Sequence, residues 1–469
     1  MPNTRRHFLQ ATLAGNLLAA KQLDPAALKQ LRTKLKGALI IPTDPEYEVA
    51  RRVFYWNPTN ERHPAIIARC TNPDDIRFTI DFAHKYKQQL AVRGGGQSFM
   101  GWGTSNGILL DLGALNRITI NASARTARIE GGALSGDVMR AAGQHGLAPI
   151  LGQCPGVGAV GVTLGGGLGW LAGLHGASCD NLISVNLITA SAGVHKADAQ
   201  QAPDLLWALK GAGANFGVTT SFETRLHPVG PVTSGDIHYS VRDAKTVLKF
   251  FRTFMAEASD GFQATLNLTS TDRGVFISFC HSGDLTEAER ILKALRTIAN
   301  PTRDTTKLQP YSDLAGRSIA AAANVSYRSI ATVYRKDLTD EVLACILDRL
   351  SQAPPEATIG ISHYMHGAVC RSDAQSTAFP LRHSGGAMIR SSVDWNDASA
   401  TTRLMPFAEE TRSLIRPESN EQIYSNYQSN SDKGSAHALY GTNLPRLRAI
   451  KSRYDPTNFF RLNSNIEPT

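Results

Sequence analysis

The chain has 469 residues, which is enough for a large buried core and more than one typical domain needs, so we expect two domains. Hydrophobic residues make up 42% of it, and no apolar run reaches the roughly 18 residues of a membrane-spanning helix. The composition therefore indicates a globular protein without a membrane span in its body.

The net charge of +9 is spread along the chain. Lys and Arg alternate with Asp and Glu, without a basic run or an aromatic-interleaved basic stripe, so we expect no nucleic-acid partner. Long-range attraction to an acidic small molecule or to a cell-envelope surface is compatible with this charge. The six cysteines lack the spacing of a metal site, so we expect no metal and mostly buried thiols.

The N-terminal segment resembles a twin-arginine export signal. Arg5 and Arg6 precede Phe8 and Leu9, and the mildly apolar run ATLAGNLLAA follows. Residues 1–40 are therefore expected to be an export signal and lead-in, with a periplasmic or secreted location. The alternative is an ordinary basic helix start in a cytoplasmic protein, because Gln10 interrupts the apolar stretch and no clear cleavage site follows.

Residues 41–228 are expected to form the first domain. Strand-like runs (QQLAV, GILLDL, TARIEGG) alternate with helix-like segments (PDDIRFTIDFAHKYKQQ, LSGDVMRAAGQHG), and glycine clusters lie between them. This texture predicts a mixed domain of strands and helices with many tight turns.

Residues 229–420 are expected to form a second domain. Strand-like runs such as FQATLNLTS and GVFISFCHS alternate with amphipathic helices such as TEAERILKALRTIA, which predicts an antiparallel sheet with helices on one face. Residues 421–469 return to a Tyr/Asn/Gly-rich composition and are expected to fold back on the first domain. The predicted fold class is thus α+β with two domains.

A first glycine loop follows the strand-like residues 90–92. Three successive glycines free the backbone to point its N–H groups at one place, and such nests bind phosphate. The alternative is a glycine-rich hairpin. The candidate residues for binding a pyrophosphate-bearing cofactor are Arg93, Gly94, Gly95, Gly96, Gln97 and Ser98.

A second, denser glycine cluster predicts a backbone pressed against something large and flat, because so many glycines cost conformational entropy unless a contact requires them. Its members are Gly152, Gly156, Gly158, Gly161, Gly165, Gly166, Gly167 and Gly169, with Cys154 among them. Gly167, Gly169 and Ala172 also match the dinucleotide pattern G-x-G-x-x-A. No clear strand precedes them and Asp180 follows too soon, so we expect no nicotinamide-binding domain.

Three stretches of the chain resemble the FAD-linked oxidases of the berberine bridge enzyme type. They are ILGQCPGVGAVGVTLGGGLGWLAGLHGASCDNL, then PDLLWALKGAGANFGVTTSFETRLHPV, and the closing YGTNLPRLRAIKSRYDPTNFF. That family belongs to the vanillyl-alcohol oxidase superfamily with its PCMH-type FAD-binding fold. The resemblance implies an FAD domain completed by the C-terminal segment, with Asn458 at the cofactor, and a sheet over the flavin as substrate surface. It also implies oxidation of alcohols, sugars or alkaloid-like carbons, usually with dioxygen as acceptor.

Members of this family commonly hold FAD by two covalent bonds, from a His in the first loop and a Cys in the second cluster. Cys154 matches the Cys, but Gln97 stands at the His position. A carboxamide is too weak a nucleophile, so the resemblance implies a single thioether from Cys154, with Gln97 as a hydrogen-bond donor near the ring. The alternative for Cys154 is a small buried residue. Val157 matches a position that gates oxygen in the family, which favours an oxidase.

The segment 422–427 matches the family's Y-x-N-Y pattern, which implies that Tyr427 is the catalytic base. On a strand, Tyr424 and Tyr427 would point to opposite faces, so we expect Tyr424 to be a core residue. A tyrosine of ordinary pKa, about 10, is a poor base at neutral pH, so it needs a nearby positive charge or a proton transfer timed to hydride loss.

In the second domain, we expect several residues to line the pocket without a catalytic role. They are His363, Tyr364, His366 and the segment 377–382. Three functions are left open. The first is an oxidase that takes hydride from a CH–OH group, and the second is a dehydrogenase with another acceptor, such as a quinone. The third is a flavin-binding protein without catalysis, prompted by Gln97.

Overall fold

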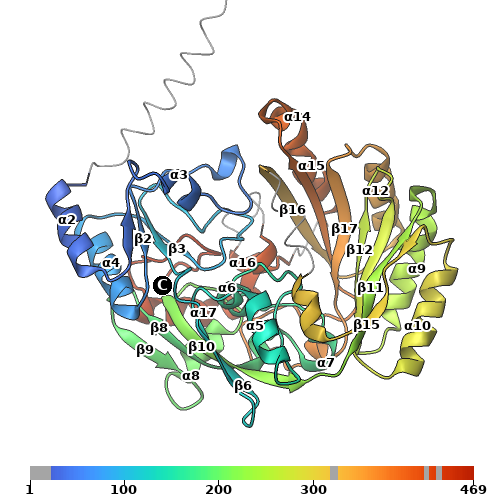
Figure 1. Ribbon diagram of the computed structural model, residues 1–469, viewed down its shortest axis with the longest axis horizontal. Coiled ribbons are helices and arrows are strands. Elements are labelled where there is room, and N and C mark those ends of the chain that lie inside the picture. Colours follow the sequence, from blue (N-terminus) through green and yellow to red (C-terminus); the bar gives the residue numbers. More distant parts are fainter. Residues whose placement is uncertain (1–22, 317–325, 417–421, 429–435) are drawn as a thin grey trace, which may run out of the picture.

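The computed structural model describes residues 23–316, 326–416, 422–428 and 436–469 (Figure 1). The expected twin-arginine motif lies outside the described residues. Within them, no helix combines the length and apolar character that a membrane crossing needs. In the same part of the chain, no three His, Cys, Asp or Glu side chains are grouped to hold a metal ion.

The first domain begins with a four-stranded sheet in the order β1-β2-β4-β3. Its strands are β1 (Ala38–Ile40), β2 (Ile66–Arg69), β3 (Leu90–Arg93) and β4 (Ile108–Asp111); β1 is antiparallel to β2, and the others run parallel. The neighbouring helices are α2 (Pro25–Lys34), α3 (Tyr47–Ala50), η1 (Pro58–Asn60) and α4 (Pro73–Lys85). The side chain of Asn72 starts α4 by accepting the N–H groups of Asp74 and Asp75.

This domain starts earlier than the expected residue 41. Ala27 and Leu31 of α2 lie in the same hydrophobic core as Ile66 and Leu110. Strand β1 also pairs with β2 before that boundary. The lead-in from residue 23 onward is therefore part of the first domain, because its apolar face has no other core to cover.

The second sheet of the first domain is antiparallel, in the order β5-β6-β10-β8-β9, with β7 paired to β10. Its strands are β5 (Ile118–Asn121), β6 (Thr126–Glu130), β7 (Leu147–Pro149), β8 (Leu182–Ile188), β9 (Val194–Ala197) and β10 (Val218–Pro228). The helices between them are α5 (Ser135–Gly143), α6 (Ala159–Leu164), α7 (Ala172–His175), η2 (Ser178–Asn181) and α8 (Pro203–Leu209).

The second domain is an eight-stranded antiparallel sheet in the order β14-β11-β13-β12-β17-β18-β16, with β15 paired to β11. Its strands are β11 (Val232–Tyr239), β12 (Phe262–Leu268), β13 (Val275–His281), β14 (Arg303–Asp304), β15 (Lys307–Gln309), β16 (Tyr327–Arg335), β17 (Ala357–Tyr364) and β18 (Ala387–Trp395). Its helices are η3 (Val241–Asp243), α9 (Ala244–Ala256), α10 (Leu285–Thr297), η4 (Tyr311–Gly316), α12 (Asp340–Ser351), α13 (Ala368–Arg371), η5 (Ala398–Ala400), α14 (Thr401–Leu404) and α15 (Pro406–Ile415).

The two faces of this sheet have different partners. Ile361 and Val393 pack with Leu248 of α9 and Ile346 of α12 in one core, on the face covered by helices (Figure 1). Because side chains alternate along a strand, Met388 points the other way, where it packs with Leu168 and other residues of the first domain. The predicted sheet with helices on one face is confirmed, and its open face meets the glycine clusters.

The C-terminal segment returns to the first domain, as expected (Figure 1). It contains η6 (Ser425–Tyr427), α16 (Ala436–Tyr440), η8 (Gly441–Asn443) and α17 (Leu444–Tyr454). Leu447 lies in one core with Phe222 of β10. The buried ammonium of Lys451 donates to the carboxylate of Asp455 at 2.8 Å and to the carbonyl of Asn215 at 2.7 Å, which fixes the helix to the first domain.

Candidate active site

The two predicted glycine loops lie against each other, backbone to backbone. A Cβ on Gly95 would lie 2.2 Å from the backbone nitrogen of Gly158, and one on Gly158 would lie 2.6 Å from the nitrogen of Gly95. Gly96 has a left-handed φ of +68°, which disfavours other residues. No side chain fits between these loops, so glycine is required there by contact as well as by conformation.

The side chain of Arg93 holds the start of the first glycine loop in place. Its guanidinium donates to the carboxylate of Asp111 at 2.8 Å and to the carbonyl of Arg52 at 3.2 Å. The carbonyl of Ser98 accepts the N–H of Gly101 and closes the turn that follows. These contacts position the loop; direct binding of phosphate by Arg93 or Ser98 stays a prediction.

Cys154 and Gln97 meet where the two loops join. The Cys154 sulfur lies 3.8 Å from Oε1 of Gln97, and both side chains are partly buried. A Cβ on Gly156 would lie 2.7 Å from Nε2 of Gln97, so the carboxamide rests on the second loop. The carbonyl of Val157, the predicted oxygen gate, accepts the N–H of Ser135 at 2.9 Å. The structure thus brings together Cys154, the predicted attachment residue, and Gln97, which stands where the family commonly has its second attachment residue.

Buried polar atoms in these segments lack partners among the described residues. They are Nε2 of Gln153 beside Cys154, the hydroxyl of Ser135 and Oδ1 of Asn458. Asn458 also has a left-handed φ of +50°. Buried polar groups normally form hydrogen bonds, so the unpaired groups of Gln153 and Ser135, whose chain neighbours contact the two loops, fit a large polar cofactor such as FAD, while the role of Asn458 stays a prediction. Gly158 precedes helix α6, and Gly161 lies within it.

The glycines in the later half of the second cluster, from Gly165 on, contact other parts of the protein and not a cofactor surface. Built Cβ atoms on Gly165, Gly166 and Gly169 would lie 2.0 Å from Asn426, 2.6 Å from Phe379 and 1.8 Å from Leu151. These glycines admit protein groups, so the interpretation of the whole cluster as a cofactor surface is wrong for this half. The physical reason is the docking of the C-terminal segment and of the second domain.

Tyr424 is a core residue, as expected. Its hydroxyl accepts the N–H of Gly167 at 2.9 Å and the Asn426 side-chain amide at 3.0 Å. The same amide also donates to the carbonyl of Val162. Burial raises the pKa of Tyr424, so it remains protonated. Tyr424 and Asn426 together hold the C-terminal segment on the glycine cluster.

Tyr427 is the last residue of η6, so the expected strand geometry is wrong. In a 3-10 turn, residues three apart lie on the same side, and the rings of Tyr424 and Tyr427 are 5.2 Å apart. The hydroxyl of Tyr427 lies 2.9 Å from Nε2 of His363, and its carbonyl accepts the hydroxyl of Thr332. A tyrosine and an imidazole are thus paired on the open face of the sheet.

Burial decides the charge of this pair. It raises the pKa of Tyr427 to about 12, against the opposing charge of Arg390. Burial, with a further contribution from the Arg390 charge, lowers the pKa of His363 to about 3. Both side chains are therefore neutral at pH 7, and a single hydrogen bond joins phenol and imidazole.

The sequence patterns did not identify three residues of this site, namely Tyr55, Phe99 and Arg390. The ring of Phe99 lies 4.5 Å from that of Tyr55 and 5.2 Å from that of Tyr427. Burial raises the pKa of Tyr55, and its ring contact with Phe99 places it beside the Tyr427–His363 pair. The run Phe54-Tyr55-Trp56 before the first loop was the available signal.

Other second-domain candidates lie outside the site. Tyr364 packs in the helix-side core, so its expected place in the pocket is wrong. His366 is buried, with both ring nitrogens unpaired among the described residues.

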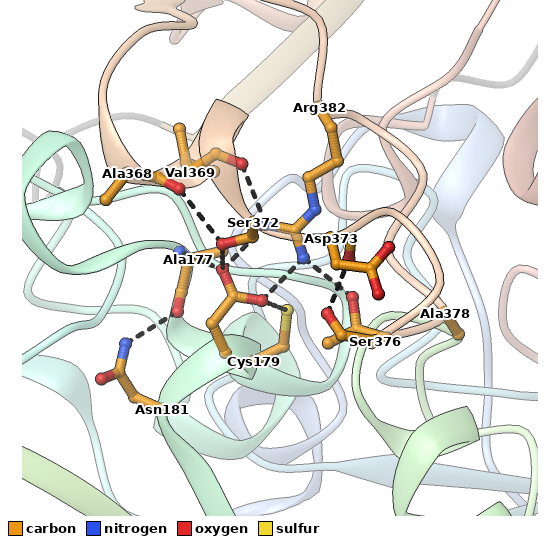
Figure 2. A network of polar contacts seen from close by, with 12 residues as sticks. Ala177, Cys179, Asn181, Ala368, Val369, Ser372, Asp373, Ser376, Ala378 and Arg382 are labelled. Carbon is orange, nitrogen blue, oxygen red and sulfur yellow. Dashed lines mark hydrogen bonds and ion pairs between the residues drawn. The ribbon is translucent and has the colours of Figure 1, made fainter.

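The segment 377–382 forms a clamp on the first domain (Figure 2). Arg382 donates to the two carboxylate oxygens of Asp180 at 2.6 and 2.8 Å and to the hydroxyl of Thr377 at 2.8 Å. Phe379 rests on Gly166. The segment was expected to line the pocket, but its contacts instead hold the second domain on the first, with Arg382 as the partner of Asp180.

Comparisons with known proteins agree with this geometry. The family model described as FAD binding domain matches residues 64–198, and the model described as Berberine and berberine like matches residues 423–467. The chain is 28% identical to the (R)-6-hydroxynicotine oxidase of Paenarthrobacter nicotinovorans, covering 92% of this chain and 97% of the relative. It is also 28% identical to an uncharacterized FAD-linked oxidoreductase, YgaK, of Bacillus subtilis (strain 168), covering 93% and 98%.

The fold is shared with a crystal structure of 6-hydroxy-D-nicotine oxidase from Arthrobacter nicotinovorans. The TM-score is 0.82 at 26% identity, over 93% of this chain and 98% of that one. Berberine bridge enzyme from Eschscholzia californica gives a TM-score of 0.83 at 21% identity, over 94% and 99%, which supports the fold alone. The chain thus shares the fold of these flavoproteins, contains an FAD binding domain and a berberine-like C-terminal segment, and is similar over its length to FAD-linked oxidoreductases.

Proposed function

We propose that the protein is an oxidase that removes a hydride from a CH–OH carbon and uses dioxygen as the final acceptor. The observation that carries this is the Tyr427–His363 pair, 2.9 Å apart, on the sheet face opposite the loops that carry Cys154. FAD supplies the two-electron hydride acceptor when it is bound. An oxidase among the relatives of similar length supports dioxygen as the acceptor.

Tyr427 receives the substrate's hydroxyl proton. A phenol with a pKa of about 12 is already protonated at neutral pH, so it accepts a proton only while passing its own to a neighbour. Nε2 of His363 is that neighbour when the other ring nitrogen carries the imidazole hydrogen. The pair thus acts as a two-member relay, with Tyr427 at the substrate and His363 behind it.

Timing makes this relay feasible. An imidazole whose pKa is about 3 is too weak a base to deprotonate an alcohol in advance. As hydride leaves the carbon, however, the hydroxyl becomes that of a protonated carbonyl, which is a far stronger acid. Proton transfer through Tyr427 to His363 therefore accompanies or follows hydride loss and does not precede it.

The first-domain residues would hold the cofactor. Backbone N–H groups of the loop at residues 94–96 would bind the pyrophosphate, and Asn458 and Gln153 would donate or accept further hydrogen bonds. We propose a single thioether between the Cys154 sulfur and ring carbon C6. Its formation replaces a ring hydrogen, releases the thiol proton and reduces one dioxygen to peroxide, which balances the two-electron oxidation.

Two further parts of the proposal concern access. Val157, whose backbone is held by Ser135 beside the junction of the loops, would control how dioxygen reaches the site. Export through a twin-arginine route suits a protein that must fold around its cofactor before it crosses a membrane. A fusion of residues 1–40 to a reporter, with and without Arg5→Lys and Arg6→Lys together, tests that part by itself.

Anaerobic titration of the purified yellow protein with a panel of alcohols, hydroxy acids and sugars tests the proposed function. We expect at least one donor to bleach the flavin absorbance, and admission of air to restore it with one peroxide per donor oxidised. Bleaching without peroxide in air would identify a dehydrogenase with another acceptor. A protein that no donor bleaches would be a binding protein and would contradict the proposal.

A further inference from the structure

Arg390 occupies the open face of the sheet, in a row of residues that crosses four strands. In the strand register, Arg390 on β18 lies opposite Thr332 on β16 and Gly360 on β17, and Gly360 lies opposite Asn267 on β12. Because Gly360 has no side chain, the guanidinium reaches across β17 to Oδ1 of Asn267, 2.7 Å from Nη2. A Cβ on Gly360 would lie 3.3 Å from that same oxygen.

This row lies beside the proposed relay. Thr332, at one end, donates its hydroxyl to the carbonyl of Tyr427. His363, three residues after Gly360 on β17, meets the hydroxyl of Tyr427. The charge of Arg390 acts on Tyr427, His363 and Tyr55 alike, and the strand register places Arg390 on the same face of the sheet as His363, so the guanidinium lies beside the proposed relay.

Among the described residues no carboxylate forms a direct ion pair with Arg390, although the charge of Asp394 interacts with it at longer range. The hydrogen-bond partner that the structure gives it is the neutral amide of Asn267, and its buried Nε has none in the same part of the chain. Asp394, on the same face of β18, lies four residues further, about 13 Å along a strand, and is paired with Arg328 at 3.8 Å. A partly buried guanidinium without a direct ion pair is costly unless an anion joins it.

We propose that Arg390 binds a carboxylate of the substrate, so that the donor oxidised at this site is a hydroxy acid or an acidic sugar. The planar guanidinium offers Nε–H and further N–H groups in the fork geometry that suits a carboxylate. It disfavours amine substrates by like-charge repulsion. The net charge of +9 adds long-range attraction for the same class of ligand. This inference rests on the proposed function for its reaction, and the anion site itself can be tested separately.

The test titrates the FAD-loaded protein with acetate, benzoate and inorganic phosphate, and follows the flavin difference spectrum. We expect saturable binding of at least one carboxylate, weakened about tenfold or more in Arg390→Met and less in Arg390→Lys. Asn267→Asp places a carboxylate against the same guanidinium without changing side-chain size, so it should weaken binding as well. Arg403→Met removes the same charge from an exposed helix and should leave the affinity unchanged.

Donor preference gives a second readout. D-glucuronate against D-glucose, and lactate against 1,2-propanediol, compare an acid with a neutral donor of similar shape in anaerobic flavin reduction. We expect the acids to be preferred in wild type and the preference to vanish in Arg390→Met. Circular dichroism and flavin content establish that each variant folds and keeps its cofactor; if Arg390→Met does not, Asn267→Asp decides.

Three results would overturn the inference. They are no carboxylate binding in wild type, binding that Asn267→Asp and Arg390→Met leave unchanged, and a preference for neutral or amine donors. If no donor reduces the flavin but carboxylate binding still depends on Arg390, the proposed oxidase function fails and the anion site stands. If neutral alcohols reduce the flavin and anions do not bind, the oxidase function stands and the anion site fails.

Discussion

The two walls of the site are built in different ways. The first-domain wall is made of backbone, with glycine loops in direct contact at Gly95 and Gly158. The second-domain wall is made of side chains, namely His363, Arg390 and Asn267, which neighbouring strands carry on one face of a sheet. Backbone contacts tolerate no substitution, whereas side chains on a sheet can change without disturbing it.

This difference separates two tasks. A cofactor that is the same in every turnover suits a rigid backbone cradle, and a substrate that differs between relatives suits exchangeable side chains. The C-terminal segment joins the walls, because Tyr424 binds Gly167 on one side and Tyr427 meets His363 on the other. Substitutions in the two walls should therefore have effects of different kinds and sizes.

The largest effect is expected at the backbone wall. In Gly95→Val, the new side chain would start 2.2 Å from the nitrogen of Gly158, and no flexible group can move aside. We expect a loss of more than about 3 kcal/mol of unfolding free energy and no bound flavin. Chemical denaturation and flavin absorbance measure both.

The control is Gly230→Val, where a built Cβ meets nothing within 4 Å. This variant should keep its flavin and unfold within about 0.5 kcal/mol of wild type. Equal losses in the two variants would mean that the contact between the loops does not carry the effect.

The proposed relay comes next in size. Tyr427→Phe keeps the ring but removes the atom that accepts the substrate's proton, so anaerobic flavin reduction should slow by about 100- to 10,000-fold. Stopped-flow absorbance measures this rate. The matched variant Tyr424→Phe should lose about 1–3 kcal/mol of stability by leaving the Gly167 N–H unpaired, and should retain a faster reduction rate than Tyr427→Phe. A Tyr427→Phe variant that reduces its flavin at the wild-type rate would remove Tyr427 from the mechanism.

A smaller loss is expected at the clamp between the walls (Figure 2). Asp180→Asn leaves the buried Arg382 without its charge partner, which should cost about 3 kcal/mol in thermal or chemical unfolding. The exposed pair Arg446–Asp204 gives a control, since Asp204→Asn should cost less than about 1 kcal/mol. Similar costs at the two sites would show that the clamp does not hold the second domain in place.

The backbone wall of the first domain could be predicted from the sequence, whereas the side-chain wall of the second domain could not. The two glycine loops were found because a backbone cradle leaves a local pattern of glycines, and the family resemblance added the roles of Cys154 and Gln97. Arg390 and Asn267 were not found, because only the register of β12, β17 and β18 brings them together. Tyr424 and Tyr427 were assigned to a strand, since three residues between buried elements carry no signal for a 3-10 turn. Phe379 and Asn426 were not expected to occupy the gaps that Gly165 and Gly166 leave.

A last prediction concerns the pH dependence of stability. Burial lowers the pKa of His363 from 6.5 to about 3, so between these values the unfolded chain binds a proton that the folded protein excludes. The stability associated with neutral His363 is therefore complete above pH 6.5 and is lost as pH falls towards 3. Urea unfolding at several pH values should show a shallower acid loss in His363→Gln. An unchanged slope would mean that His363 is not kept neutral by burial.

The most direct test of the central claim is the mass of the denatured polypeptide. Wild type, unfolded in acid and washed, should retain one FAD less two hydrogen atoms, and Cys154→Ala should release all of its flavin while still folding and binding it beforehand. Flavin that leaves the wild-type chain, or stays on Cys154→Ala, would contradict a single sulfur link at the junction of the two glycine loops.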